Sequence, residues 1–391
     1  MIGFWGEVRQ IELETDTIQQ VLIWLESRQE LIRAIHYRYA GHRLQNGERV
    51  LVNMSGVDLQ LGTGGFGFVM ATDIDWQAES PPPQHSALAG KDEHPRNFKL
   101  WPYAGRIIKL RYSPSQTPVQ TAECEESEAH SLFCQPFSLQ GRYVIAGELH
   151  SMLPVLAALL YCWQPERRIA YIMDDQAALH IGFSDHIRRL QKQVRLTTIT
   201  YGQAVGGDVE TVNVYTALEA AVKVVGADDI IITQGPGVVG TRTIRGFSGM
   251  QLAHWIHVIA TSGGVPVVIP RIQWGDQRSR HKGLSEHTRY PLLAHTLAKA
   301  CIPYPTQIST YYEDGRISDE ILEEQMNQLR EKHEVIPIPV YHFHRELEEA
   351  LQWYGTVKTM GRSYADDPSF FAAVGAVFHF YRSSGKMTND T

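Results

Sequence analysis

Ile230–Gln234, with the sequence IIITQ, runs directly into Gly235–Thr243, with the sequence GPGVVGTRT. The first part is a short apolar run that predicts a buried strand, and the second is a glycine-rich turn. Apolar residues at helical spacing follow a few residues later, at Leu252, Trp255, Ile256 and Ile259. In α/β proteins such a strand, turn and helix often place backbone N–H groups where they hold an anion. The stretch therefore predicts one βα unit with a ligand site near its turn.

The same alternation of apolar runs and helical periods extends on both sides of this unit, over residues 142–382. Further strands are predicted at Tyr143–Ala146, Ile169–Met173, Thr197–Tyr201, Val265–Val268, residues 302–308 and Val335–Val340. Amphipathic stretches between them predict helices, and Pro368 predicts the first turn of a last one, with Asp366 or Asp367 as its cap. Repeated βα units favour a doubly wound, mainly parallel sheet of the Rossmann-like kind.

The N-terminal part, residues 1–112, has the pattern of a β-rich domain without helices. Glycine and asparagine separate short runs that are rich in Val, Ile, Leu and aromatic residues. The predicted strands are Thr17–Glu26, Leu31–Tyr39, Arg49–Val57, Phe66–Thr72 and Arg106–Tyr112. Short strands in close succession predict a small β-barrel or β-sandwich.

Two other segments lack periodic structure. Residues 113–141 are rich in Pro, Ser and Glu, which predicts a linker or loop insertion between the β-rich domain and the α/β domain. Residues 383–391 form a polar tail that we expect to be disordered.

Composition narrows the classes of protein that fit. The 391 residues are 43% hydrophobic and 20% charged, as in ordinary globular proteins. A net charge of −7 gives no general attraction to nucleic acid or to anionic membranes, so neither is expected as a partner. The most lipophilic run, Met152–Trp163, is far shorter than the roughly 20 residues that span a bilayer, and the N-terminus lacks a signal-peptide pattern. We expect a cytoplasmic protein, and a homo-oligomer is compatible with the sequence.

Polar residues follow the predicted strands, and this places a candidate site at one edge of the sheet. Ligands of open parallel sheets bind beyond the carboxyl ends of the strands. The candidates for acid–base catalysis are Glu148, His150 and Asp208. Other polar residues at the same edge are Asp174, Asp175, Gln203, Glu210, Gln234, Arg271, Gln273, Asp276, His281 and His287. Helix capping is the alternative for Asp174 and Asp208, and an exposed loop position is the alternative for His281 and His287.

The glycine turn itself has several interpretations. Gly235, Gly237 and Gly240 match the G-x-G-x-x-G pattern of dinucleotide sites. That fingerprint normally opens the first βα unit and has an acidic residue after the next strand, where this chain has Arg271, so NAD(P) is disfavoured. Anion binding fits better, with backbone donors from the turn, Thr241 beside them, and charge from Arg242, Arg245 and Arg271. The alternative is a sharp loop whose glycines serve only the backbone geometry.

Metal binding is left open. Glu148, His150, Asp174, Asp208, His281 and His287 have suitable ligand atoms, but no pair of them has the spacing of a known metal motif. Cys124, His130 and Cys134 lie together in a polar segment, without the further ligands that a structural zinc site needs. The sequence therefore names no metal and no cofactor.

Several motifs occur in a combination that resembles a known family. They are Leu61–Gly65, Gly147–Ser151, Gly206–Glu210, Val212–Tyr215, Gly235–Thr241, Val268–Arg271, Thr359–Arg362 and Asp367–Phe371. Together they resemble the bacterial domain-of-unknown-function family numbered 3866, over nearly the whole chain. The resemblance implies kinship and no particular reaction. It adds Arg362 as a ligand-binding candidate, because the Gly361–Arg362 turn follows a late element and could face the same edge.

Two hypotheses follow for function. In the first, the protein is an enzyme that acts on a small anionic ligand, such as a phosphorylated metabolite or a nucleotide. Glu148, His150 and Asp208 would then lie within a few ångströms of one another. In the second, the same groove belongs to a non-catalytic ligand-binding or regulatory module.

Overall fold

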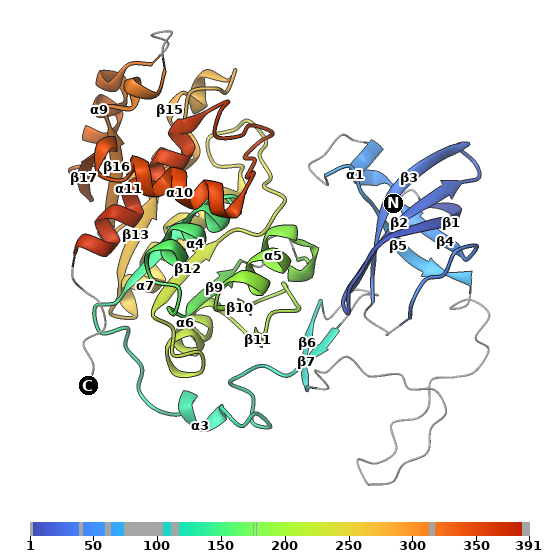
Figure 1. Cartoon of the computed structure of the whole chain (residues 1–391). Helices are drawn as coiled ribbons and strands as arrows, with labels where there is room; N and C mark the ends of the chain where they lie inside the picture. The colour runs from blue at the N-terminus through green and yellow to red at the C-terminus, as the bar shows by residue number, and fades with distance from the viewer. Residues whose placement is uncertain are drawn as a thin grey trace. The chain divides into compact units, whose positions relative to one another are not determined.

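The computed structural model describes residues 3–38, 42–58, 64–73, 105–110, 117–174, 176, 178–312 and 317–384 (Figure 1). The chain divides into two compact units. The first, the barrel unit, comprises Met1–Ile108 and Ser115–Val119, and the second, the sheet unit, comprises Lys109–Pro114 and Gln120–Thr391. The domain boundaries expected from the sequence, at 112/113 and 141/142, remain predictions. Most of the predicted tail, residues 385–391, lies outside the described residues.

The barrel unit is a closed five-stranded barrel with the strand order β1-β2-β3-β5-β4. Its strands are β1 (Gly3–Glu14), β2 (Ile18–Leu25), β3 (Glu30–Tyr37), β4 (Arg49–Asn53) and β5 (Gly67–Thr72), and α1 (Ser55–Asp58) connects the last two. Only β3 and β5 pair in parallel. The sequence allowed a barrel or a sandwich, and the structure shows the barrel. One predicted strand is placed elsewhere, because β6 (Ile107–Lys109) pairs with β7 (Thr117–Val119) and not with the barrel.

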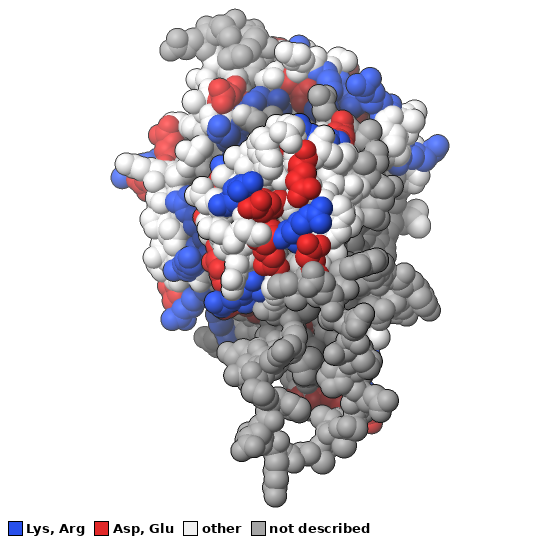
Figure 2. Space-filling view, turned by 90° about the vertical axis from the view of Figure 1, so that its right-hand side faces the viewer, with Lys and Arg blue, Asp and Glu red and all other residues white. Residues whose placement is uncertain are grey.

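Buried apolar residues alternate with more exposed residues along the strands, and this explains why the barrel closes around an apolar core. Val21, Ile23 and Leu25 on β2 are fully buried, and they pack with Val50 and Val52 of β4. Ion pairs such as Arg28–Asp58, at 2.6 Å, and Arg33–Glu12, at 3.0 Å, lie on the outside. Figure 2 shows acidic and basic side chains intermixed on one face of the molecule. Among the residues coloured there, that face has no extended patch of one charge.

The sheet unit is built on an eight-stranded sheet in which every pairing is parallel. The strand order is β11-β10-β9-β12-β8-β13-β16-β17. The strands are β8 (Tyr143–Gly147), β9 (Ile169–Met173), β10 (Leu196–Thr200), β11 (Val209–Glu210), β12 (Asp229–Thr233), β13 (Val265–Ile269), β16 (Cys301–Thr306) and β17 (Glu334–Pro339). All the strands predicted for the α/β region are present, and the two-residue β11 is an addition. The parallel sheet predicted from the βα rhythm is therefore confirmed.

Helices pack on the sheet in two groups. One group contains α4 (Met152–Trp163), α10 (His344–Tyr354) and α11 (Pro368–Ser383), which contact one another. The other contains α6 (Val214–Lys223), α7 (Gln251–Thr261) and α8 (Glu286–His295), and α7 packs on β8 and β13. The remaining helices are α3 (His130–Phe133), α5 (Asp185–Gln193) and α9 (Asp319–Asn327). No helix within the described ranges is both long and apolar enough to cross a membrane.

The strand order places a crevice beside β8 and β13. These two strands are neighbours, and Gly147 pairs with Ile269 at their carboxyl ends. From β8 the chain passes through α4 to β9 on one side, and from β13 it passes through α8 to β16 on the other. Adjacent connections that leave in opposite directions open a crevice at the strand ends, where ligands of such sheets bind.

Candidate functional site

A buried ion pair between Arg271 and Glu148 lies at this crevice. Arg271 follows β13 and Glu148 follows β8, and each residue is 2% exposed. Nη1 of Arg271 donates to Oε1 of Glu148 at 3.0 Å, and Oγ1 of Thr288 donates to Oε2 of Glu148 at 2.6 Å. Nε of Arg271 donates to Oε1 of Gln273 at 3.3 Å. Within the described part of the chain, the buried Nη2 of Arg271 has no hydrogen-bond partner.

A pocket of about 200 Å³, here called the arginine pocket, is lined by both members of this pair. Its lining residues are Glu148, Val238, Val239, Gly240, Ser248, Gly249, Arg271, Arg278, Arg280, His281, His287 and Met360. Three arginines thus face one carboxylate. The pocket therefore has an excess of positive charge close to a buried, unpaired guanidinium donor.

Two histidines in the arginine pocket are held in the neutral form. Nε of Arg280 donates to Nε2 of His281 at 3.1 Å, so the ring proton of His281 lies on Nδ1, 2.8 Å from Oγ of Ser285. Burial, helped by Arg271, lowers the pKa of His281 to about 3. Burial also lowers the pKa of His287, although Glu148 acts in the opposite direction. The arginines therefore supply the positive charge of the pocket at neutral pH.

A short strand pair and several hydrogen bonds, together called the brace, hold the segment that carries Arg278 and Arg280 in place. β14 (Ile272–Gln273) and β15 (Gly283–Leu284) form an antiparallel pair at its two ends, which the sequence reading did not predict. Asp276 accepts hydrogen bonds from Nε and Nη2 of Arg278 at 2.9 and 2.8 Å. These bonds hold the pKa of Asp276 well below its usual range. The brace keeps the cationic segment at the rim of the pocket.

Arg362, a predicted ligand-binding residue, belongs to this brace. Its Nη2 donates to Oε1 of Gln273 at 3.2 Å and lies 3.4 Å from Oδ2 of Asp276. Asp367 holds the same segment by accepting the backbone N–H groups of Trp274 and Gly275. Its carboxylate therefore does not cap α11, although the residue occupies the predicted cap position. Arg362 is not among the residues that line the arginine pocket.

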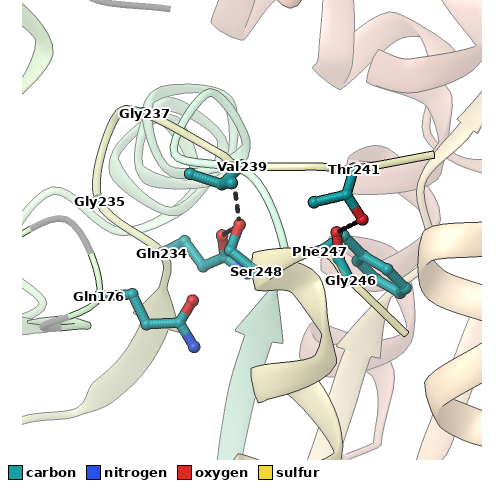
Figure 3. Close-up of a pocket in the computed structure, with 9 residues that line it drawn as sticks. All are labelled: Gln176, Gln234, Gly235, Gly237, Val239, Thr241, Gly246, Phe247 and Ser248. Carbon is teal, nitrogen blue, oxygen red and sulfur yellow. Dashed lines mark hydrogen bonds between the residues drawn. The ribbon is translucent and has the colours of Figure 1, made fainter. Parts of the chain in front are cut away.

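The glycine turn lines a second pocket of about 290 Å³, here called the glycine-turn pocket (Figure 3). Its lining residues are Gln176, Gln234, Gly235, Gly237, Val239, Thr241, Gly246, Phe247 and Ser248. Ser248 connects Val239 of the turn to Gln234, the residue before it. Its Oγ accepts the Val239 N–H at 3.1 Å and donates to Oε1 of Gln234 at 2.8 Å. Nε2 of Gln234, a residue only 3% exposed, has no partner among the described residues.

The backbone donors expected from the glycine turn are partly used within it. The Val239 N–H bonds to Ser248, and the Thr241 N–H donates to the Gly246 carbonyl at 2.8 Å. Arg242 and Arg245 are exposed and line neither pocket. The structure thus places Gly235, Gly237 and Thr241 at one pocket, and Gly240 and Arg271 at the other.

The three predicted catalytic residues have separate partners. Glu148 pairs with Arg271, as described above. His150 lies 3.0 Å from the hydroxyl of Tyr171 and 2.6 Å from Oγ of Ser184, away from both pocket linings. Burial lowers the pKa of His150 to about 3.

Asp208 is exposed, and its carboxylate accepts hydrogen bonds from the backbone and side chain of Thr198, both at 2.8 Å. The reason is local. The chain turns back at Gly206, and β11 begins beside Ile199, so Asp208 lies level with the middle of β10. The structure therefore does not bring Asp208 to Glu148 or His150.

The described residues contain no group of three His, Cys, Asp or Glu side chains placed to hold a metal ion. Sγ of Cys134 lies 3.5 Å from Nε2 of His130. In the described part of the chain, Cys134 and His130 therefore have no third metal-ligand side chain beside them. The same holds for the metal candidates at the sheet edge.

The sequence did not identify Arg278, Arg280 and Thr288 as site residues. It also did not indicate that Ser248 bridges Gln234 and Val239. The signal for the arginines was present as the basic run Arg278-Ser279-Arg280-His281-Lys282. Nothing local pointed to Thr288, because its contact with Glu148 joins residues 140 positions apart.

The family of proteins of unknown function DUF3866 matches residues 33–377 of the chain. The match starts within β3 and extends into α11. It confirms the resemblance seen in the sequence motifs. No curated protein matches the sequence.

Proposed function

The chain belongs to the DUF3866 family, and we propose that it binds a small anionic ligand, phosphorylated or nucleotide-like, in the arginine pocket at the carboxyl edge of a Rossmann-like sheet. One observation carries the proposal: the guanidinium of the buried Arg271 keeps an unpartnered Nη2 donor beside this pocket. A buried donor without a partner costs about 1–3 kcal/mol, and such groups are rare in native proteins. A bound anion would supply the missing acceptor.

The charges around Arg271 support an anion over a neutral ligand. Glu148 offsets the charge of Arg271 and Asp276 offsets that of Arg278, so Arg280 leaves an excess of positive charge at the same pocket. Guanidinium groups match the geometry of phosphate and carboxylate oxygens, with two parallel hydrogen bonds. The low polarity of a buried site strengthens these interactions relative to water.

A second candidate function, catalysis on the same ligand, is favoured by His287. Its ring lines the arginine pocket, and within the described residues its nitrogens have no hydrogen-bond partner. Burial lowers the pKa of His287, and the nearby Glu148 carboxylate partly offsets this effect. A neutral imidazole beside a bound anion is suited to accept a proton. In this version His287 replaces His150 and Asp208 as the acid–base group.

Calorimetric titration tests the binding proposal. Inorganic phosphate, ribose 5-phosphate and adenosine monophosphate are titrated into the wild type and into Arg271→Lys, which keeps a positive charge but loses the Nη2 donor. We expect binding to the wild type and an affinity about 10- to 100-fold lower in the variant, the range for one hydrogen bond to a charged group. The matched control is Arg289→Lys on α8, since Arg289 bonds to Gln328 and lines neither pocket.

Circular dichroism and the melting temperature show whether each variant is folded. Absence of binding across the panel, or equal affinities for the wild type and Arg271→Lys, would contradict the proposal. If binding holds, His287→Gln separates the two functions. If the site is catalytic, the wild type hydrolyses a phosphate ester and His287→Gln lowers that rate about 10²- to 10⁴-fold. If the wild type shows no turnover, the site is a binding module.

A further inference from the structure

We infer that the ligand has two parts, and this inference rests on the proposed function. Its anionic group occupies the arginine pocket. An uncharged portion, which presents a hydroxyl or carbonyl oxygen as a hydrogen-bond acceptor, occupies the glycine-turn pocket. The ligand class is a phosphate ester of a polar, uncharged carrier, such as a sugar or a nucleoside.

The first argument is the unpartnered amide of Gln234. Oγ of Ser248 accepts the Val239 N–H, so the hydroxyl hydrogen of Ser248 is available for Oε1 of Gln234. This leaves the Nε2 hydrogens of Gln234 without a partner among the described residues, in a residue that is only 3% exposed. Gln234 lines the glycine-turn pocket, so a fixed donor that lacks an acceptor lies beside this pocket. Nη2 of Arg271 is another such donor at this sheet edge.

The second argument is that the two pockets adjoin. Val239 and Ser248 line both of them. Phe247 lines the glycine-turn pocket and His287 lines the arginine pocket, and their rings stack with centroids 4.1 Å apart. This stacked pair forms part of the partition between the pockets. A single molecule that occupies both pockets would contact Val239 and Ser248.

The third argument is size. The glycine-turn pocket measures about 290 Å³, at the lower limit of the roughly 300–1,000 Å³ of typical small-molecule sites, and the arginine pocket, at about 200 Å³, lies below that limit. The two pockets together lie well within the range. A small anion alone would leave the larger of the two pockets empty.

The fourth argument is the difference in charge between the pockets, which sets the orientation of the ligand. The lining of the glycine-turn pocket, as far as the structure describes it, has no Asp, Glu, Lys or Arg side chain. A charged group placed there would lose its hydration without gaining a counter-ion. The arginine pocket has three arginines. The anionic end is therefore expected beside Arg271 and the uncharged end beside Gln234.

A comparison of ligands across two variants tests this inference. Inorganic phosphate represents the anionic group alone, ribose 5-phosphate and adenosine monophosphate represent the two-part ligand, and ribose and adenosine represent the carrier alone. Affinities are measured by calorimetry for the wild type, Gln234→Leu and Arg271→Lys. Gln191→Leu on α5 is the matched control, because Gln191 bonds to Asp208 outside both pockets.

We expect at least one phosphate ester to bind the wild type 10-fold or more tightly than inorganic phosphate. In Gln234→Leu the affinity for phosphate is expected to stay the same and that for the ester to fall about 2- to 12-fold, the range for one net hydrogen bond. Arg271→Lys is expected to weaken both. If Gln234→Leu melts at a lower temperature than the wild type, Gln234→Met, of the same length, takes its place.

Two different results would overturn different claims. If phosphate binds but the esters bind no more tightly, or if the loss of the Gln234 amide leaves ester affinity unchanged, the two-part ligand is wrong and the anion site stands. If neither phosphate nor any ester binds, the proposed function itself is wrong, and the inference fails with it.

Discussion

At the scale of single residues, Arg271 shows how position and partner together define a site. Its place after a buried strand was enough to make it a candidate, because strand ends meet at one edge of a parallel sheet. Its partner, Glu148, comes from 123 positions away, and the ion pair uses only one of the guanidinium amino groups. Breaking such a buried pair by removing one member typically costs about 3–5 kcal/mol. Conservative replacements are therefore the informative ones here.

We predict that His281 stays neutral at every pH above about 5, with its proton on Nδ1. Its pKa is lowered to about 3, with burial as the main cause and Arg271 adding to it. Nitrogen chemical shifts followed from pH 8 to pH 4, and assigned with His281→Gln, measure both properties. Because the folded pKa lies below the unfolded one, His281 contributes stability above the unfolded pKa that is lost as pH falls toward 3. Titration near pH 6.5, or a proton on Nε2, would contradict the assignment.

We predict that Gly237→Ala destabilises the protein by about 1–2 kcal/mol, because an L-residue is strained in this backbone conformation. Gly237 has φ of +100°, and a Cβ there would have no heavy atom within 4 Å, so the backbone alone causes the effect. Gly235→Ala is the control, since φ of Gly235 is not positive and its Cβ would meet the flexible Met173 side chain at 3.3 Å. Urea unfolding measures both. An equal effect of the two substitutions would refute the explanation.

At the scale of elements, local signals decide where helices start, and distant contacts decide what the loops do. α6 begins at an Asn213 cap that its own sequence encodes, with Asn213 and Thr216 forming reciprocal hydrogen bonds. Ser248 also has the chemistry of a cap, yet its hydroxyl bonds to the glycine turn. The difference is that Gln234 and Val239 lie within its reach only in the folded chain.

We predict that Asn213→Ala lowers the free energy of unfolding by about 1 kcal/mol, the usual cost of removing an N-cap. Oδ1 of Asn213 accepts the N–H groups of Tyr215 and Thr216 at 2.9 and 3.1 Å. The residue is exposed, so little packing is lost with its side chain. Asn213→Asp, which keeps an acceptor, should behave as the wild type in urea unfolding. A stable Asn213→Ala variant would show that the cap contributes nothing.

At the scale of the whole molecule, one buried ion pair joins distant parts of the chain within the sheet unit. Nζ of Lys109 donates to Oε2 of Glu210 at 2.6 Å and to the carbonyls of Thr200 and Ala204. Lys109 is 2% exposed, and 101 positions separate it from Glu210. Burial raises the pKa of Glu210, while Lys109 lowers it. The contact secures the segment at Lys109 to the end of β10.

We predict that Lys109→Met destabilises the protein by about 3–5 kcal/mol at pH 7.5, because it leaves the Glu210 carboxylate buried without its cation. Burial already raises the folded pKa of Glu210 above its usual value, and the loss of Lys109, which acts in the opposite direction, raises it further. Stability is then greatest below the unfolded pKa and falls as pH rises through the folded one. The difference in the free energy of unfolding between Lys109→Met and the wild type should therefore be smaller at pH 5 than at pH 7.5, as measured by urea unfolding. Lys109→Met combined with Glu210→Gln should recover part of the loss, and a difference that does not change with pH would count against this account.

The candidate site was only partly visible in the sequence. Arg271 and Glu148 could be placed at one edge because their strands could be recognised and ordered. Asp208 was expected there because it follows a predicted strand, but the turn at Gly206 carries it back beside Thr198. His150 was expected to face the site, and instead it bonds to Tyr171 and Ser184.

The sequence by itself determined the parallel sheet, four of the five barrel strands (β1, Gly3–Glu14, was not predicted) and the neighbourhood of the glycine turn. The reason is that periodic burial is a local property, set by the spacing of apolar residues along the chain. The tertiary structure alone decided which buried polar groups remain without hydrogen-bond partners, and Nη2 of Arg271 and Nε2 of Gln234 are two of them that belong to pocket-lining residues. Hydrogen-bond satisfaction depends on residues that meet only after folding, and a donor left over in a buried pocket is a property of the whole arrangement.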